Sequence, residues 1–209
     1  IGIPTFDFDG DDGLTSWLIA DNLTLQVENI DEGNDSFNGT LRIDRGSLDV
    51  DVADDLWIMD GTLNFTSAFA GSQDGELHGD TVQISGTVDV NDEQHRIFAD
   101  TTFTSTASVD VEAGAFLWME GATTYLGGTY GGNGSLKHPG DVSVPENVTL
   151  GVANVGFTGG VTIDSGATLS LVVDTLGAGD DVLNADFTLE GGGLFVNNPA
   201  NFWTLGAGG

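Results

Sequence analysis

Short segments in which apolar and polar residues alternate recur along the chain, and turn-forming residues separate them. A two-residue period is typical of a β-strand with one buried and one exposed face. The separating pairs are DG, GG, GN, NG and SG, which favour tight turns. The clearest segments are LTLQV at 23–27, TLRI at 40–43, SLDVDV at 47–52, TLNF at 62–65, TVQI at 81–84, SVDV at 108–111 and VTI at 161–163. Related positions, such as GTL at 39–41 and 61–63, return at intervals of roughly 17 to 25 residues, which predicts a repeat architecture.

The chain combines a strong acidic charge with enough apolar residues to form a core. Its 209 residues include 33 Asp and Glu against 4 Lys and Arg, yet 39% are hydrophobic, among them 12 Phe and 4 Trp. We therefore expect a folded, soluble chain whose formal charge of −29 coats a core. So few basic side chains exclude binding to a nucleic acid backbone or to an anionic membrane. The absence of Cys excludes disulfides, and no run approaches the roughly 18 apolar residues of a membrane span.

A longer internal repeat aligns residues 23–61 with residues 169–207 at an offset of 146 residues (169 minus 23). Apolar positions fall on apolar positions and turn glycines on turn glycines, while the acidic residues vary. This repeat predicts one long unit over 1–146 and, continuous with it, the start of a second copy over 147–209. Because the second copy stops inside the unit, we expect the segment to continue head to tail, either covalently or by association with another copy.

Two glycine-rich stretches resemble a known group of proteins. They are TYLGGTYGGNGSLKHPGDVSVPENVTLGV at 124–152 and GVTIDSGATLSLVV at 160–173. Both are similar to the coils of bacterial surface β-solenoids, the autotransporter passengers and filamentous haemagglutinin-like adhesins. The resemblance implies an all-β, parallel β-solenoid, most simply a right-handed β-helix, that is secreted, displayed on the surface and used for adhesion or as a stalk. Strands with glycine turns also fit β-sandwich domains in tandem, which is the alternative fold.

Four aspartates lie in TFDFDGDDGL at 5–14. In a calcium loop of the EF-hand type that begins at Asp7, the residues Asp7, Asp9 and Asp11 fill the first three acidic positions. Asp12, however, occupies the sixth position, where such a loop needs Gly. The alternative is an acidic strand and turn, because the two phenylalanines alternate with aspartates and can point into a core. Asp7, Asp9 and Asp11 are therefore the candidate ligands of a calcium ion.

No motif in the chain indicates catalysis. A polysaccharide lyase needs a basic proton acceptor, and a glycosidase needs two carboxylates facing each other in a cleft. Pairs of aspartates are so frequent here that no single pair is informative. His78, His95 and His138 stand in polar, turn-like contexts without a partner serine or a zinc-binding spacing, and we expect them at the surface.

The tryptophans bear on carbohydrate binding. Trp57 and Trp203 share one position of the long repeat together with their apolar neighbours, and LWM around Trp118 echoes the same motif. A tryptophan that recurs with apolar neighbours is expected in the core. A row of exposed aromatic side chains on one face would instead favour a sugar-binding surface.

These observations predict an extracellular, cell-surface repeat protein with a structural or adhesive role, an elongated rod or filament without enzymatic activity. The alternative is a carbohydrate-binding or carbohydrate-cleaving β-helix module. No cofactor is required, and Ca²⁺ is the single candidate. The expected partners are further copies of the unit and a glycan or another cell-surface receptor, with no nucleic acid and no membrane insertion.

A calcium titration separates the two interpretations of the aspartate-rich segment. If Asp7, Asp9 and Asp11 bind an ion, a chelator lowers the melting temperature, and Asp9→Asn abolishes that shift because a ligand is lost. Equal melting curves with and without chelator leave only the acidic strand and turn.

Overall fold

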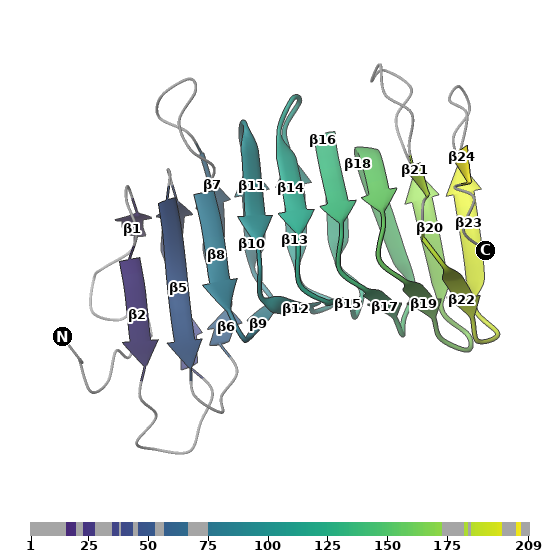
Figure 1. Ribbon diagram of the computed structural model, residues 1–209, viewed down its shortest axis with the longest axis horizontal. Coiled ribbons are helices and arrows are strands. Elements are labelled where there is room, and N and C mark those ends of the chain that lie inside the picture. The colour runs from purple at the N-terminus through teal and green to yellow at the C-terminus, as the bar shows by residue number, and fades with distance from the viewer. Residues whose placement is uncertain are drawn as a thin grey trace.

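The computed structural model describes residues 16–19, 23–27, 35–37, 39–43, 46–52, 57–66, 75–172, 182–183, 185–197 and 204–205. They form a parallel β-solenoid of at least six turns, and no helix occurs among them. Figure 1 shows the strands stacked side by side along the long axis of the molecule. All strand pairs in these ranges are parallel. The predicted solenoid is confirmed, and the alternative of antiparallel β-sandwiches is wrong; the right-handed coil stays a prediction.

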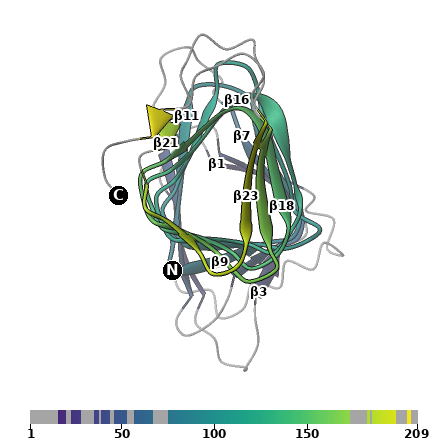
Figure 2. The ribbon, with the colours of Figure 1, turned by 90° about the vertical axis from the view of Figure 1, so that its right-hand side faces the viewer.

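Each coil contributes strands to three faces that enclose the core (Figure 2). The first face contains β1 (Ser16–Ile19), β4 (Thr40–Ile43), β7 (Thr62–Phe65), β10 (Thr87–Val90), β13 (Ser108–Val111), the first halves of β16 (Thr129–His138) and β18 (Val148–Phe157), β20 (Thr168–Val172) and β23 (Gly193–Asn197). The second face contains β2 (Leu23–Val27), β5 (Gly46–Val52), β8 (Gly75–Gly79), β11 (Gln94–Ile97), β14 (Phe116–Met119), the second halves of β16 and β18, β21 (Val182–Leu183) and β24 (Thr204–Leu205). The third face contains β3 (Asp35–Phe37), β6 (Trp57–Met59), β9 (Thr81–Ile84), β12 (Asp100–Phe103), β15 (Thr123–Tyr125), β17 (Val142–Val144), β19 (Val161–Ile163) and β22 (Phe187–Leu189).

The length of most coils agrees with the interval of roughly 17 to 25 residues predicted from the sequence, but Gly46 pairs with Gly75, which is 29 residues later (75 minus 46). Thr40 pairs with Thr62, so the two GTL triplets occupy the same position in successive coils. The spacing between paired residues is not constant along the stack. Phe116 pairs with Ser135 (135 minus 116 gives 19), whereas Val161 pairs with Phe187 (187 minus 161 gives 26). The coils therefore differ in loop length while their strands remain in register.

In the central strands, from β6 to β20, alternate side chains enter the core and stack on the equivalent side chains of the next coil. On the first face one such ladder consists of Leu41, Leu63, Val88, Val109, Tyr130 and Leu150. All six are buried, with 0 to 3% of their surface exposed. Because fully burying an aliphatic side chain of this size contributes roughly 1.5–3 kcal/mol, these ladders are the main source of stability.

A column of glycines forms the corner between the second and third faces. Gly121, Gly140 and Gly159 follow one another at a constant interval (140 minus 121 and 159 minus 140 both give 19). A Cβ atom on Gly140 would lie 2.1 Å from the carbonyl oxygen of Gly121, and one on Gly159 would lie 2.3 Å from that of Gly140. Only glycine allows the backbones of successive coils to approach this closely at the corner.

Two aspartates on the outer surface form hydrogen bonds between successive coils at the same corner. The Asp100 carboxylate accepts a hydrogen bond of 2.8 Å from the Ala122 amide, and the Asp141 carboxylate accepts one of 2.8 Å from the Gly160 amide. These amides lie outside the strand ladders, and the aspartates satisfy them where the chain turns.

The long sequence repeat aligns strands with strands, but the aligned strands lie on different faces of the solenoid. Its alignment of 23–61 with 169–207 makes β2 and β5 of the second face correspond to β20 and β23 of the first face. The two aligned segments are therefore displaced by one face around the coil. The division into a unit of 1–146 and a second copy of 147–209 stays a prediction.

Replacing Gly140 by Ala tests the corner. We expect Gly140→Ala to lower the free energy of unfolding by about 1–3 kcal/mol, because the new methyl group overlaps the carbonyl of the preceding coil. Gly131→Ala is the matched control, since its Cβ would have no atom within 4 Å, and we expect a change within about 0.5 kcal/mol. Urea denaturation measures both; equal losses would contradict the close-approach explanation.

Candidate binding surface on the second face

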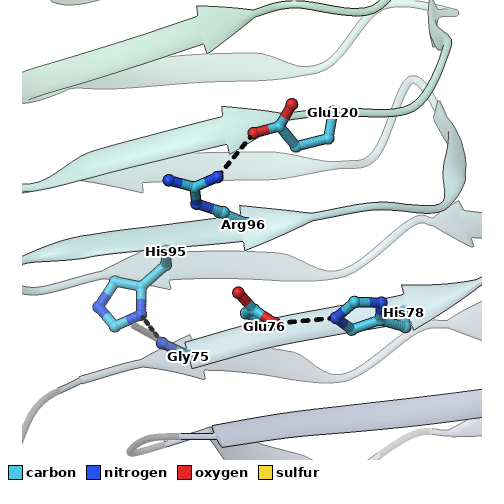
Figure 3. A network of polar contacts seen from close by, with 6 residues as sticks. All are labelled: Gly75, Glu76, His78, His95, Arg96 and Glu120. Carbon is cyan, nitrogen blue, oxygen red and sulfur yellow. Dashed lines mark hydrogen bonds and ion pairs between the residues drawn. The ribbon is translucent and has the colours of Figure 1, made fainter. Parts of the chain in front are cut away.

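The outer surface of the second face carries a group of aromatic and charged side chains, here called the aromatic–charged patch. It consists of Glu76, His78, Arg96, Phe98, Trp118, Glu120 and Lys137. They project from β8, β11, β14 and β16 or from the residue that follows the strand. Figure 3 shows four of them on neighbouring strands.

The register of the strands arranges the patch in two rows across successive coils. In one row Arg96 lies between Glu76 and Trp118, and Trp118 lies beside Lys137. The other row includes Phe98: its amide donates a hydrogen bond of 2.8 Å to the Leu77 carbonyl, which places it beside His78. The Glu120 amide donates to the carbonyl of the residue before Phe98 at 2.8 Å, so Glu120 lies on the other side.

Contacts inside the patch orient its side chains. His78 Nε2 is 2.9 Å from a Glu76 carboxylate oxygen, and the His78 ring stacks on Phe98 with centroids 4.4 Å apart and planes 17° from parallel. Arg96 donates a hydrogen bond of 3.2 Å to Glu120, and its guanidinium carbon lies 5.8 Å from the centre of the Trp118 ring. Partly exposed pairs of this kind contribute little to stability. Their main effect is to hold the exposed groups in one arrangement.

The patch differs in charge from the rest of the chain. Two of the four Lys and Arg residues, Arg96 and Lys137, lie here together with only two of the 33 acidic residues, Glu76 and Glu120. The patch is therefore locally neutral on a molecule whose formal charge is −29.

Phe98 is an exposed aromatic residue in the middle of the stack. It is 37% exposed. The other exposed large apolar residues in the described ranges are Val172, Leu189 and Phe195, which all belong to the last coils. Phe98 is thus exposed where coils continue on both sides, so a missing neighbouring coil does not explain its exposure.

The prediction of surface histidines is wrong for two of the three. His78 is partly exposed, but His95 and His138 are 0% and 1% exposed. His95 Nδ1 accepts a hydrogen bond of 3.0 Å from the Gly75 amide (Figure 3), and its ring stacks on Phe65 with centroids 5.1 Å apart. The two-residue period could have indicated this burial, because His95 shares the inward face of β11 with Ile97.

His138 and Tyr125 form a hydrogen-bonded pair in the core. The Tyr125 hydroxyl lies 2.6 Å from His138 Nε2, and the His138 ring stacks on Phe157 with centroids 4.9 Å apart. Burial lowers the pKa of His138 to about 3, and the charge of Lys137 acts in the same direction. Burial also raises the pKa of Tyr125 well above its ordinary value. Both groups are neutral near pH 7, and the hydrogen bond between them provides a partner in the core for the Tyr125 hydroxyl and for His138 Nε2.

The tryptophans divide between core and surface. Trp57 is 5% exposed, which confirms its predicted place in the core. Trp118 instead points outward between the buried residues Leu117 and Met119 and is only partly buried, so the prediction fails there. Trp203 lies outside the described residues.

The candidate calcium ligands Asp7, Asp9 and Asp11 also lie outside the described residues. Within the described part of the chain, no group of three or more His, Cys, Asp and Glu side chains could hold a metal ion. The calcium site therefore stays a prediction from the sequence.

No protein-family model matches the chain, and no curated protein or solved structure shows significant similarity to it. The class that the structure defines is the parallel β-solenoid. In the ranges that the structure covers, no helix is long and apolar enough to cross a membrane.

The buried histidine predicts a dependence of stability on pH. The folded pKa of His138, about 3, lies below its ordinary value of 6.5, so the unfolded chain binds the proton more tightly. The stability that comes from neutral His138 is complete above about pH 6.5 and is lost as pH falls toward 3, approaching tenfold in the unfolding equilibrium per pH unit.

His138→Gln provides the measurement, because Gln keeps a hydrogen-bonding side chain and does not titrate. Relative to this variant, the wild-type chain should lose stability between about pH 7 and pH 5 in chemical denaturation, while the effects of the carboxylates cancel. Identical pH profiles for the wild-type chain and His138→Gln would contradict the pKa shift.

Proposed function

We propose that this chain is a structural and adhesive segment of an extracellular, cell-surface rod. The observation that carries the proposal is the stack itself: the strand columns run through successive coils without a change in topology. In such a stack each coil buries the apolar side chains of its neighbours, so length is set by the number of coils. The resemblance of residues 124–152 and 160–173 to bacterial surface adhesins supports the same function.

The acidic coat suits a rod in an aqueous exterior. With a formal charge of −29, neighbouring rods repel each other sideways, which disfavours lateral aggregation of exposed strands. The proposed function is not catalytic and requires no cofactor. Its partners are further coils at the ends of the rod and a receptor or glycan on its faces.

The last described coil supports end-to-end continuation. Leu194 and Val196 point into the core but are only partly buried, whereas Leu169 and Leu171, their partners one coil earlier, are 0% exposed. Among the described residues, β22 and β23 each pair on one side only. A further coil, covalent or from a second copy, would cover these side chains and pair these edges.

Scattering and electron microscopy test the rod. We expect an elongated particle, with a radius of gyration clearly above the roughly 17 Å of a globule of this length, and fibres with an axial repeat at high concentration. Leu194→Glu should suppress the fibres because it places a charge on the apolar end, while Thr162→Glu on the outer third face should not. Compact particles, or monomers whose two ends are covered by their own chain, would overturn the proposal.

A further inference from the structure

We infer that the aromatic–charged patch binds a neutral polysaccharide. A sugar ring packs against the exposed part of Phe98, and the polar side chains around it exchange hydrogen bonds with the sugar hydroxyls. The inference rests on the adhesive part of the proposed function and names the class of ligand. It does not depend on how the ends of the rod associate.

The exposed aromatic surface supplies the apolar contact for a sugar ring. Phe98 keeps 37% of its surface exposed although coils continue on both sides of it. Its ring is held by the stacked imidazole of His78 at 4.4 Å, and Trp118 presents a second partly exposed ring on the adjacent coil. The C–H groups of a sugar ring pack against exposed aromatic surface of this kind, and side chains already fixed in position lose little entropy when the ligand binds.

The polar groups match the hydroxyls of a sugar. Glu76 and Glu120 offer carboxylate oxygens that accept hydrogen bonds, while the planar guanidinium of Arg96 donates them. Partners within the patch orient all three: the carboxylates contact His78 and Arg96 at 2.9 and 3.2 Å. Donors and acceptors beside an aromatic ring recognise vicinal hydroxyls, which both donate and accept.

The balance of charge favours a neutral ligand. Arg96 and Lys137 are matched by Glu76 and Glu120, so the patch offers no excess positive charge to a carboxylated or sulfated polymer. The rest of the molecule repels such a polymer, because its formal charge is −29. A polycation would be attracted to the whole acidic surface and would not need this patch.

The extent of the patch favours a polymer over a single sugar. It crosses four successive coils, from β8 through β11 and β14 to β16. Three spacings of about 4.8 Å between neighbouring strands give a length of roughly 14 Å. This length accommodates more than one sugar ring on the outer face of the sheet. Repeated weak contacts along a chain then add up in the manner of multivalent binding.

Retention of the full chain on insoluble polysaccharides tests the inference. The panel contains neutral cellulose, chitin, xylan and mannan, with pectate as the acidic polymer. We expect retention on at least one neutral polysaccharide and not on pectate. Binding should persist in about 1 M salt, where the screening length is about 3 Å, because it does not rely on ion pairs.

Phe98→Ala is the decisive variant, and Phe195→Ala is its matched control. Phe195 is an equally large aromatic residue, 55% exposed and outside the patch. We expect Phe98→Ala to weaken binding at least about tenfold and Phe195→Ala to leave it unchanged. We expect circular dichroism to show that both variants fold, because both side chains are partly exposed.

Four results would overturn the inference: no retention on any neutral polymer, a preference for pectate, equal effects of the two phenylalanine variants, or a change of oligomeric state in Phe98→Ala that reveals a contact between copies. If electron microscopy shows rods but no polysaccharide binds, the polysaccharide inference is wrong and the proposed rod is still supported. Compact particles that bind cellulose through Phe98 would support the polysaccharide inference and contradict the proposed rod.

Discussion

The in-register pairing of parallel strands between successive coils is the constraint on which the rest of the structure depends. Each interior strand bonds to the strand before and after it in the stack, so the backbone ladder and the side-chain ladders share one alignment. Because side chains alternate between the two faces of a strand, a slip of one residue would turn a column such as Leu63 and Val88 toward water. Hydrogen bonding and apolar burial therefore specify the same register. The corner glycines allow that register to continue where the chain changes face, since a side chain at Gly140 would separate two coils.

The fold and most of the core could be predicted because their signals are local. The two-residue period identifies the strands, the glycine and aspartate turns separate them, and the interval between the GTL triplets gives the length of one coil and the approximate length of the others. The prediction of surface histidines failed because the polar residue type was given more weight than the two-residue period of the strands. His95 and His138 occupy inward positions next to Ile97 and Leu136, and partners such as the Gly75 amide and the Tyr125 hydroxyl make their burial possible. The sequence does not reveal such partners, because they come from other coils.

The aromatic–charged patch could not be predicted for a related reason. Its rows pair Glu76 with Arg96 (96 minus 76 gives 20), Arg96 with Trp118 (118 minus 96 gives 22) and Trp118 with Lys137 (137 minus 118 gives 19). No constant spacing links them, since loops of different length intervene. The long repeat likewise shows that sequence spacing does not determine position around the coil. It aligned strand with strand, but only the strand pairing shows that the aligned strands lie on different faces.

A solenoid separates the residues that stabilise it from those that can carry function. Inward positions form the ladders, whereas outward positions can vary with little effect on the packing of the core, because exposed pairs such as Arg96 and Glu120 contribute little to stability. An outer surface shaped only by solubility would continue the acidic coat. The patch departs from that coat in two independent respects, since it gathers two of the four basic residues and exposes Phe98 in the middle of the stack. Neither feature strengthens the ladders beneath it, and both support the proposal that this surface contacts another molecule.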